Sequence, residues 1–159
     1  MKYRHRYVVQ APSFFVSEFH TKSASLGLIT PPWIPLRLHE APERLTEGDR
    51  IVFSLGLGPL PIRWEARIES ITPEGFTDRM ISGPFQSWVH EHTFLPIEDG
   101  HTEVIDEIEF TVHPHLLWGP VGILSALSLP LLFAYRGWKT KRLLQTDGAT
   151  TVQEQSKET

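Results

Sequence analysis

Alternating apolar and polar side chains dominate the middle of the chain and predict a β-sheet. Successive side chains of a strand point to opposite faces, so residues 60–70 would form a strand with one apolar face and one charged face. The apolar set is Ile62, Trp64, Ala66 and Ile68, and the charged set is Arg63, Glu65, Arg67 and Glu69. The same reasoning predicts seven strands, at residues 3–10, 33–39, 50–57, 60–70, 76–81, 83–94 and 101–113.

Helical spacing replaces this alternation between the first two strands and near the C-terminus. Phe14, Phe15, Val16 and Phe19 predict a short helix over residues 13–20, and a second short helix is expected over 23–28. A proline at position 12 suits the first turn of a helix, and the prolines at 31 and 32 must end the second one. A third, longer helix is expected from about residue 121 to 144.

A sheet with one apolar face needs a cover. Only the C-terminal helix is long enough to lie across it, and the two short helices would close one end. The sequence therefore predicts an α+β fold in which a seven-stranded antiparallel sheet wraps around a long C-terminal helix. A cavity is expected between the helix and the sheet.

The strand at residues 83–94 carries the candidate wall of this cavity. One of its faces holds a row of large and titratable side chains, Gln86, Trp88, His90, His92 and Phe94. This row is too bulky and too polar for ordinary sheet packing. We expect a ligand to contact Trp64, Trp88, His90, His92 and Phe94, together with Asp106, Ile108 and Phe110 on the inward face of the last strand.

Asp106 is the one charged residue among the apolar positions of the last strand, where a carboxylate is costly unless it is paired. If the hairpin turns near residue 99, Asp106 lies opposite or diagonal to His92. Such a pair could orient a ligand or serve only the structure. It could also act in catalysis, with the carboxylate raising the basicity of the ring.

His90 and His92 have a spacing that serves a metal when a third ligand comes from elsewhere. No matching cluster of histidines or carboxylates stands out in the rest of the sequence. We therefore predict neither a metal nor a cofactor. Asp78 and Arg79 are interpreted as a strand end and turn before Gly83.

Composition excludes several classes of function. The formal net charge of -4 argues against a general nucleic-acid binder, because no basic block is available to displace phosphate counterions. The chain has no cysteine, which excludes disulfides, thiolate catalysis and cysteine-based metal sites. Its first residues mix basic groups with short apolar runs, so no signal peptide is expected and the cytoplasm is the simplest location.

Residues 116–135 contain no charged side chain or histidine, and a basic run, residues 136–142, follows them. The segment could only cover the sheet, or it could cover the sheet and also contact a membrane surface or a second subunit with its outer face. A third alternative is that it spans a membrane. A kink is expected at Pro130. The folded domain is predicted to occupy residues 1–145, followed by a disordered tail at 146–159.

Several segments resemble the START-like helix-grip superfamily, and within it the bacterial ligand-binding and polyketide-cyclase-like branch. They are APSFFVSEFH, LITPPW, GDRIVFSLGLGPLPIRWEARI, FTDRMISGPFQSWVHEHTF, DEIEFTV and FAYR. The resemblance implies a deep hydrophobic cavity for lipids, quinones, sterols or polyketides, as a rule without a metal or covalent cofactor. Transfer proteins, coenzyme Q-binding proteins and cyclases share this fold, so it implies no single activity. The C-terminal helix departs from the pattern, because relatives tend to carry charges on its outer face.

The leading hypothesis is a non-catalytic protein that binds or carries a hydrophobic small molecule. The second is an enzyme of the cyclase or dehydratase kind, using His90, His92 and Asp106 in the same cavity. The third is a membrane-apposed or partner-binding module, such as a homodimer, that uses the apolar helix as its interface.

Overall fold

The computed structural model describes residues 1–58 and 60–155 of the chain. Seven strands and three α-helices follow one another, with one short 3₁₀ turn, η1, between the last two strands. Their bounds are β1 Lys2–Val9, α1 Ser13–His20, α2 Ser23–Ile29, β2 Leu36–Glu40, β3 Arg50–Leu57, β4 Leu60–Thr72, β5 Gly75–Ser82, β6 Phe85–Ile97, η1 Glu98–Gly100, β7 His101–Val112 and α3 Trp118–Gln155.

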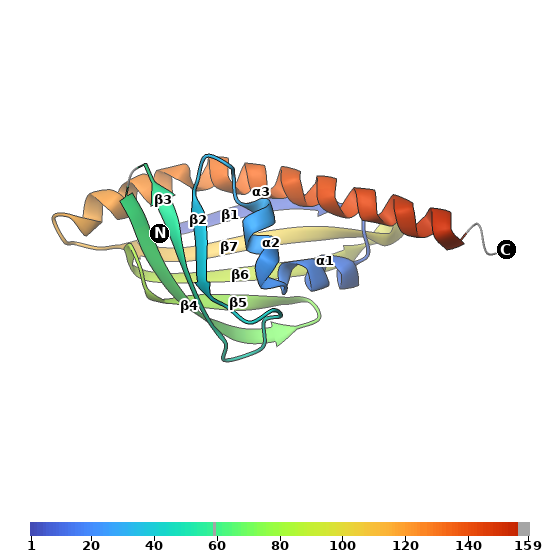
Figure 1. Cartoon of the computed structure of the whole chain (residues 1–159), viewed down its shortest axis with the longest axis horizontal. Helices are drawn as coiled ribbons and strands as arrows, with labels where there is room; N and C mark the ends of the chain where they lie inside the picture. Colours follow the sequence, from blue (N-terminus) through green and yellow to red (C-terminus); the bar gives the residue numbers. More distant parts are fainter. Residues whose placement is uncertain (59, 156–159) are drawn as a thin grey trace.

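The strands form one antiparallel sheet in the order β1-β7-β6-β5-β4-β3-β2. α3 runs along one side of this sheet, and α1 and α2 pack near one end of it (Figure 1). From β2 to β7, each strand pairs with the next strand in the sequence. β1 pairs with β7 instead, so the first and last strands lie side by side at one edge of the sheet. The predicted α+β helix-grip architecture is confirmed.

The apolar side chains of the strands pack toward the helices in two adjoining clusters. One lies near α1 and includes Val9, Val16 and Phe94, and the other lies under the middle of α3 and includes Trp88 and Phe133. The opposite face of the sheet carries exposed ion pairs, such as Arg4 with Glu107 and Arg79 with Glu69. One dry face and one wet face are therefore present, as the alternation in β4 predicts.

Glycines let α3 approach the sheet closely. A Cβ at Gly137 would lie 3.1 Å from the ring of Tyr7 and 3.2 Å from Nε2 of His5, both on β1. A Cβ at Gly122 would lie 3.1 Å from the carbonyl oxygen of Pro84. These two contacts, about four turns of helix apart, hold the helix against β1 and against the start of β6.

Three local predictions need correction. A bulge where β6 begins to pair with β7 places Phe85 on the inward face and leaves Gln86 exposed, so Gln86 does not belong to the inward row. β2 begins at Leu36, not at residue 33, because Pro35 cannot donate a ladder hydrogen bond. α3 begins three residues earlier than predicted, and it continues as one helix through Pro130.

The predicted boundary at residue 145 falls inside α3, which continues to Gln155. Residues 156–159 lie outside the described part of the chain. The division into a folded domain and a disordered tail stays a prediction.

Candidate functional site

A cavity of about 200 Å³ lies between the sheet and the helices α2 and α3. Its walls are mostly apolar side chains of β3 and β4, with Leu129 and Phe133 of α3 on the opposite side. Trp64 and Trp88 meet edge to face there, with ring centroids 5.1 Å apart. The lining also contains polar side chains, among them Ser23, Ser125 and Ser128, and one cluster of titratable groups around His90 and His92, which we call the polar end.

Four of the eight predicted ligand-contacting residues line this cavity. They are Trp64, Trp88, His90 and His92. The other four are buried but do not line it. They are Phe94, Asp106, Ile108 and Phe110. Ile108 and Phe110 pack with Trp88 in the cluster under α3, so their inward direction is as predicted.

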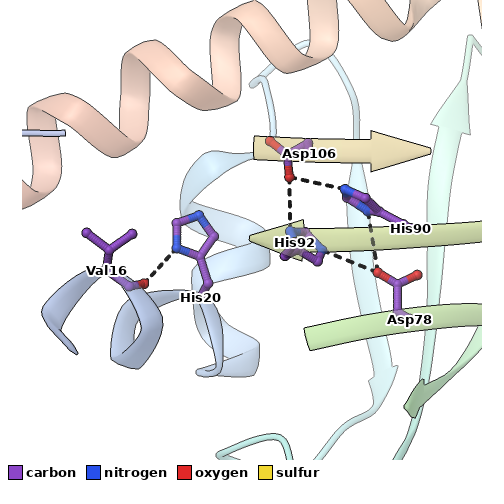
Figure 2. Close-up of polar contacts among 6 residues, drawn as sticks. All are labelled: Val16, His20, Asp78, His90, His92 and Asp106. Carbon is purple, nitrogen blue, oxygen red and sulfur yellow. Dashed lines mark hydrogen bonds and ion pairs between the residues drawn. The ribbon is translucent and has the colours of Figure 1, made fainter. Parts of the chain in front are cut away.

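The polar end is a cluster of two imidazoles between two carboxylates (Figure 2). His90 and His92 lie on the inward face of β6, with ring centroids 3.8 Å apart. Asp106 comes from β7 on one side and Asp78 from β5 on the other. Asp106 is paired directly with His92 in the β6–β7 ladder, as the sequence predicts, and Asp78 is paired with His90 in the β5–β6 ladder.

Every ring nitrogen of this cluster is close to a carboxylate oxygen. His90 Nε2 is hydrogen-bonded to Asp106 Oδ1 at 3.1 Å, and His92 Nε2 to Asp78 Oδ2 at 3.4 Å. His90 Nδ1 lies 3.4 Å from Asp78 Oδ2, and His92 Nδ1 lies 3.0 Å from Asp106 Oδ1. The last contact is short but is not a hydrogen bond, so His92 Nδ1 is a buried atom without a hydrogen-bond partner among the described residues.

The carboxylates control the ionisation of this end of the cavity. Burial alone would lower the pKa of His90, but the hydrogen bonds and charges of Asp106 and Asp78 outweigh it and raise that pKa to about 9. Burial likewise disfavours the charged carboxylates, yet His90 and His92 hold the pKa of Asp78 and of Asp106 well below the usual range. Both aspartates are therefore anionic at neutral pH.

Two further polar side chains face this region from the helices. His20 of α1 is bonded through Nδ1 to the carbonyl oxygen of Val16 at 2.8 Å, and burial lowers its pKa to about 4. Arg136 of α3 also lines the cavity, and burial lowers its pKa in spite of the nearby Asp106 and Asp78. Arg136 Nε is buried and has no hydrogen-bond partner within the described residues.

Asp78 and Arg136 are the site residues that the sequence analysis missed. Asp78 is not a turn residue, because it lies in the middle of β5 and faces inward. Its signal was the alternation of Phe76, Asp78 and Met80. Arg136 is not part of a surface basic run, since it shares the inward face of α3 with Phe133 and follows it by one turn. The argument that no third ligand group accompanies His90 and His92 is also wrong, because Asp78 reaches both of them.

The outer face of α3 is a second unusual feature. Apolar residues recur along it at helical spacing and remain exposed, among them Ile123, Leu124, Leu127, Leu131 and Trp138. By length and composition, the part of α3 from 118 to 145 could cross a membrane, and only 22% of its most apolar 18-residue window is buried. The helix therefore covers the sheet with one face and leaves an apolar stripe on the other.

No protein-family model matches the sequence, and no curated protein matches it. Solved structures do. The nucleoside-diphosphate sugar epimerase from Corynebacterium glutamicum is 27% identical, with a TM-score of 0.71 over 94% of this chain. This chain spans 30% of the epimerase chain.

Two further similar structures are close to this chain in length. The Zhui aromatase/cyclase from a Streptomyces species is 14% identical, with a TM-score of 0.69 and coverage of 91% of this chain and 93% of that one. Norcoclaurine synthase from Thalictrum flavum, solved with dopamine and hydroxybenzaldehyde, is 15% identical, with a TM-score of 0.68 and coverage of 92% and 87%. This chain therefore shares the helix-grip fold of these structures.

Proposed function

We propose that this protein binds and carries a hydrophobic small molecule in the cavity between the sheet and α3. The observation that supports this proposal most strongly is the combination of apolar walls with a few polar side chains, His90, His92 and Arg136, that line the same cavity. Apolar walls supply affinity, and a few convergent polar groups fix the orientation of a ligand. An aromatic group the size of a Phe or Trp side chain buries roughly 150–250 Å², which at about 25 cal/mol per Å² contributes about 4–6 kcal/mol.

The cavity also suggests which ligands would fit. At about 200 Å³ it is smaller than the roughly 300–1,000 Å³ of pockets for drug-sized ligands, which favours a compact molecule of one or two rings. The edge-to-face indoles of Trp64 and Trp88 suit a flat ring. The unpartnered Arg136 Nε would donate to a ligand oxygen, so we infer a phenolic, quinonoid or carboxylate group at that end.

The same cavity would serve an enzyme of the cyclase or dehydratase kind, which is the alternative function. Two of the similar structures are an aromatase/cyclase and a synthase. Carriage is preferred because ligand binding alone accounts for both the apolar walls and the polar side chains of the cavity. A bound molecule that is recovered unchanged would support carriage, and conversion of that molecule at a rate above background would support the enzyme.

Binding of two matched probes tests the proposal. We would titrate the protein with 2-naphthoate and with 2-methylnaphthalene and follow quenching of tryptophan fluorescence, since Trp64 and Trp88 line the cavity. Both probes should bind, with 2-naphthoate about tenfold tighter. Arg136→Gln should remove that difference, whereas Arg67→Gln on the wet face of β4 should preserve it. Failure of both probes to bind in the cavity would contradict the proposal.

A membrane surface is the second candidate partner, and the exposed stripe on the outer face of α3 supports it. Trp138 ends the stripe, and Lys139, Lys141 and Arg142 follow immediately. Tryptophan is favoured at the boundary between apolar chains and headgroups, and lysine and arginine attract anionic headgroups. We infer that α3 lies in the surface of an anionic membrane with its outer face buried, which would let the carrier collect and deliver an apolar ligand there.

A further inference from the structure

Three side chains at the polar end of the cavity converge on one point. Asp78, His90 and His92 all line the cavity, and one ligand atom of each lies within 4.8 Å of the other two. Asp78 Oδ2 is 3.4 Å from His90 Nδ1 and 3.4 Å from His92 Nε2. Ligand atoms bound to one tetrahedral ion at about 2.0–2.1 Å are about 3.3 Å apart, so the two separations from Asp78 already match this spacing.

Asp106 lies on the other side of the same imidazoles and does not line the cavity. Its Oδ1 is 3.1 Å from His90 Nε2 and 3.0 Å from His92 Nδ1. Asp106 therefore lies near one nitrogen of each ring, and Asp78 lies near the other. Histidines that bind a metal almost always donate the other ring N–H to a carboxylate, carbonyl or water. Asp106 makes this hydrogen bond with His90 Nε2, and its Oδ1 lies 3.0 Å from His92 Nδ1 (Figure 2).

The three converging atoms could exchange protons for an ion. Without an ion, protons on His90 Nδ1 and His92 Nε2 lie between these nitrogens and the carboxylate of Asp78. A bound ion would take their place, accept the lone pairs of both nitrogens beside the carboxylate, and release these protons.

We propose that Asp78, His90 and His92 bind a divalent first-row transition ion, of the Zn²⁺ or Fe²⁺ kind, with Asp106 orienting the two imidazoles. Two nitrogens and one oxygen suit such ions, whereas Mg²⁺ and Ca²⁺ prefer oxygen ligands alone. Three protein ligands leave at least one coordination position for a ligand oxygen on the cavity side. The proposal goes beyond carriage and does not depend on it.

Charge also agrees with a bound ion. A divalent ion would balance the two carboxylates, Asp78 and Asp106, that flank the imidazoles. Arg136 then adds one positive charge at the same end of the cavity. With the ion bound, this end is complementary to a ligand that carries one negative charge, such as a phenolate or carboxylate.

Titration of the full, tag-free chain with Co²⁺ tests this site, because Co²⁺ is a spectroscopic substitute for Zn²⁺ and Fe²⁺. After treatment with a chelator, the protein should bind one equivalent of Co²⁺, with visible d–d absorption, and Zn²⁺ should displace it. His90→Gln, His92→Gln and Asp78→Asn should each weaken binding more than the roughly 10–100-fold expected for Asp106→Asn. His39→Gln is the matched control, since His39 is exposed on β2 and bonds Ser54.

The wild-type protein provides a second measurement in case a variant fails to fold. Bound Co²⁺ is paramagnetic and should shift the NMR signals of the ring protons of His90 and His92 more than those of the other histidines. Binding of less than one equivalent, or binding that all cluster variants and His39→Gln weaken equally, would overturn the proposal. Because the measured quantity is the ion itself, that result would leave the ligand cavity standing.

Discussion

His92 lies directly opposite Asp106 in the β6–β7 ladder, and His92 Nδ1 is 3.0 Å from Asp106 Oδ1. Asp106 also accepts the hydrogen bond of His90 Nε2, so one carboxylate holds two imidazoles in place. Removing one member of a buried charged pair is costly, because the remaining groups lose their partner and stay buried.

Asp106→Ala should therefore lower the free energy of unfolding of the metal-free protein by about 3–5 kcal/mol. Urea denaturation followed by tryptophan fluorescence measures the loss. Glu107→Ala is the control, because this neighbouring residue points outward and pairs with Arg4 at the surface. Its cost should not exceed about 1 kcal/mol. Equal losses in the two variants would show that Asp106 does not anchor the cluster.

His20 should make stability depend on pH. Its folded-state pKa of about 4 is below the value of about 6.5 expected in the unfolded chain. Between these two values the unfolded chain binds more protons at this residue, so its contribution to stability falls as the pH falls from about 6.5 to 4. NMR titration of the His20 ring should give a midpoint near 4. A midpoint near 6.5 would contradict the burial of this ring.

Gly137 should tolerate no large side chain, because Tyr7 and His5 lie against it. Gly137→Leu should lower the free energy of unfolding by about 1–3 kcal/mol or more, as expected for overpacking. Ala134→Leu, less than one turn away on the exposed face, should change it by no more than about 0.5 kcal/mol. Thermal unfolding of the two variants compares these costs. A neutral Gly137→Leu would mean that α3 does not approach β1 as closely as described.

The outer stripe of α3 should control attachment to membranes. Leu127 and Leu131 are 74% and 62% exposed, so replacing both with glutamate should leave the fold intact. Wild-type protein should float with phosphatidylcholine vesicles that contain phosphatidylserine, and less so at high salt. The double variant should stay unbound, whereas Lys2→Gln on the wet face of the sheet should float like the wild type.

A different result would identify another partner for this stripe. If the wild type does not float but sediments as a dimer, and the double variant is a monomer, the stripe is a subunit interface. That outcome would contradict the proposed membrane contact and leave the cavity unaffected.

The sequence predicted the fold well because the fold depends on periodicity. Alternation in β4 and helical spacing in α1 placed those elements within two residues of their observed ends. The errors in strand face and strand start came from a bulge and a proline, whose effects cannot be read from periodicity. A bulge moved Phe85 inward in place of Gln86, and Pro35 delayed the start of β2.

The site was predicted in part, for a related reason. Asp106 was found because a lone carboxylate interrupts an apolar strand face. The expected hairpin placed it opposite or diagonal to His92, and the structure shows that it is opposite. Asp78 was missed because β5 is short and its alternation is diluted by neighbouring polar residues. Arg136 was assigned to a basic run by its neighbours in sequence, although its helical phase relative to Phe133 points it inward.

Native mass spectrometry of the protein purified from its own host, followed by denaturing extraction, would show whether the cavity carries a ligand. We expect a stoichiometric mass increment that denaturation releases as a compact aromatic or quinonoid molecule with an oxygen group. We also expect that Ala66→Phe, which fills the cavity wall from β4, abolishes the increment. A protein that is empty as isolated, and that takes up nothing from an extract of its host, would contradict the account.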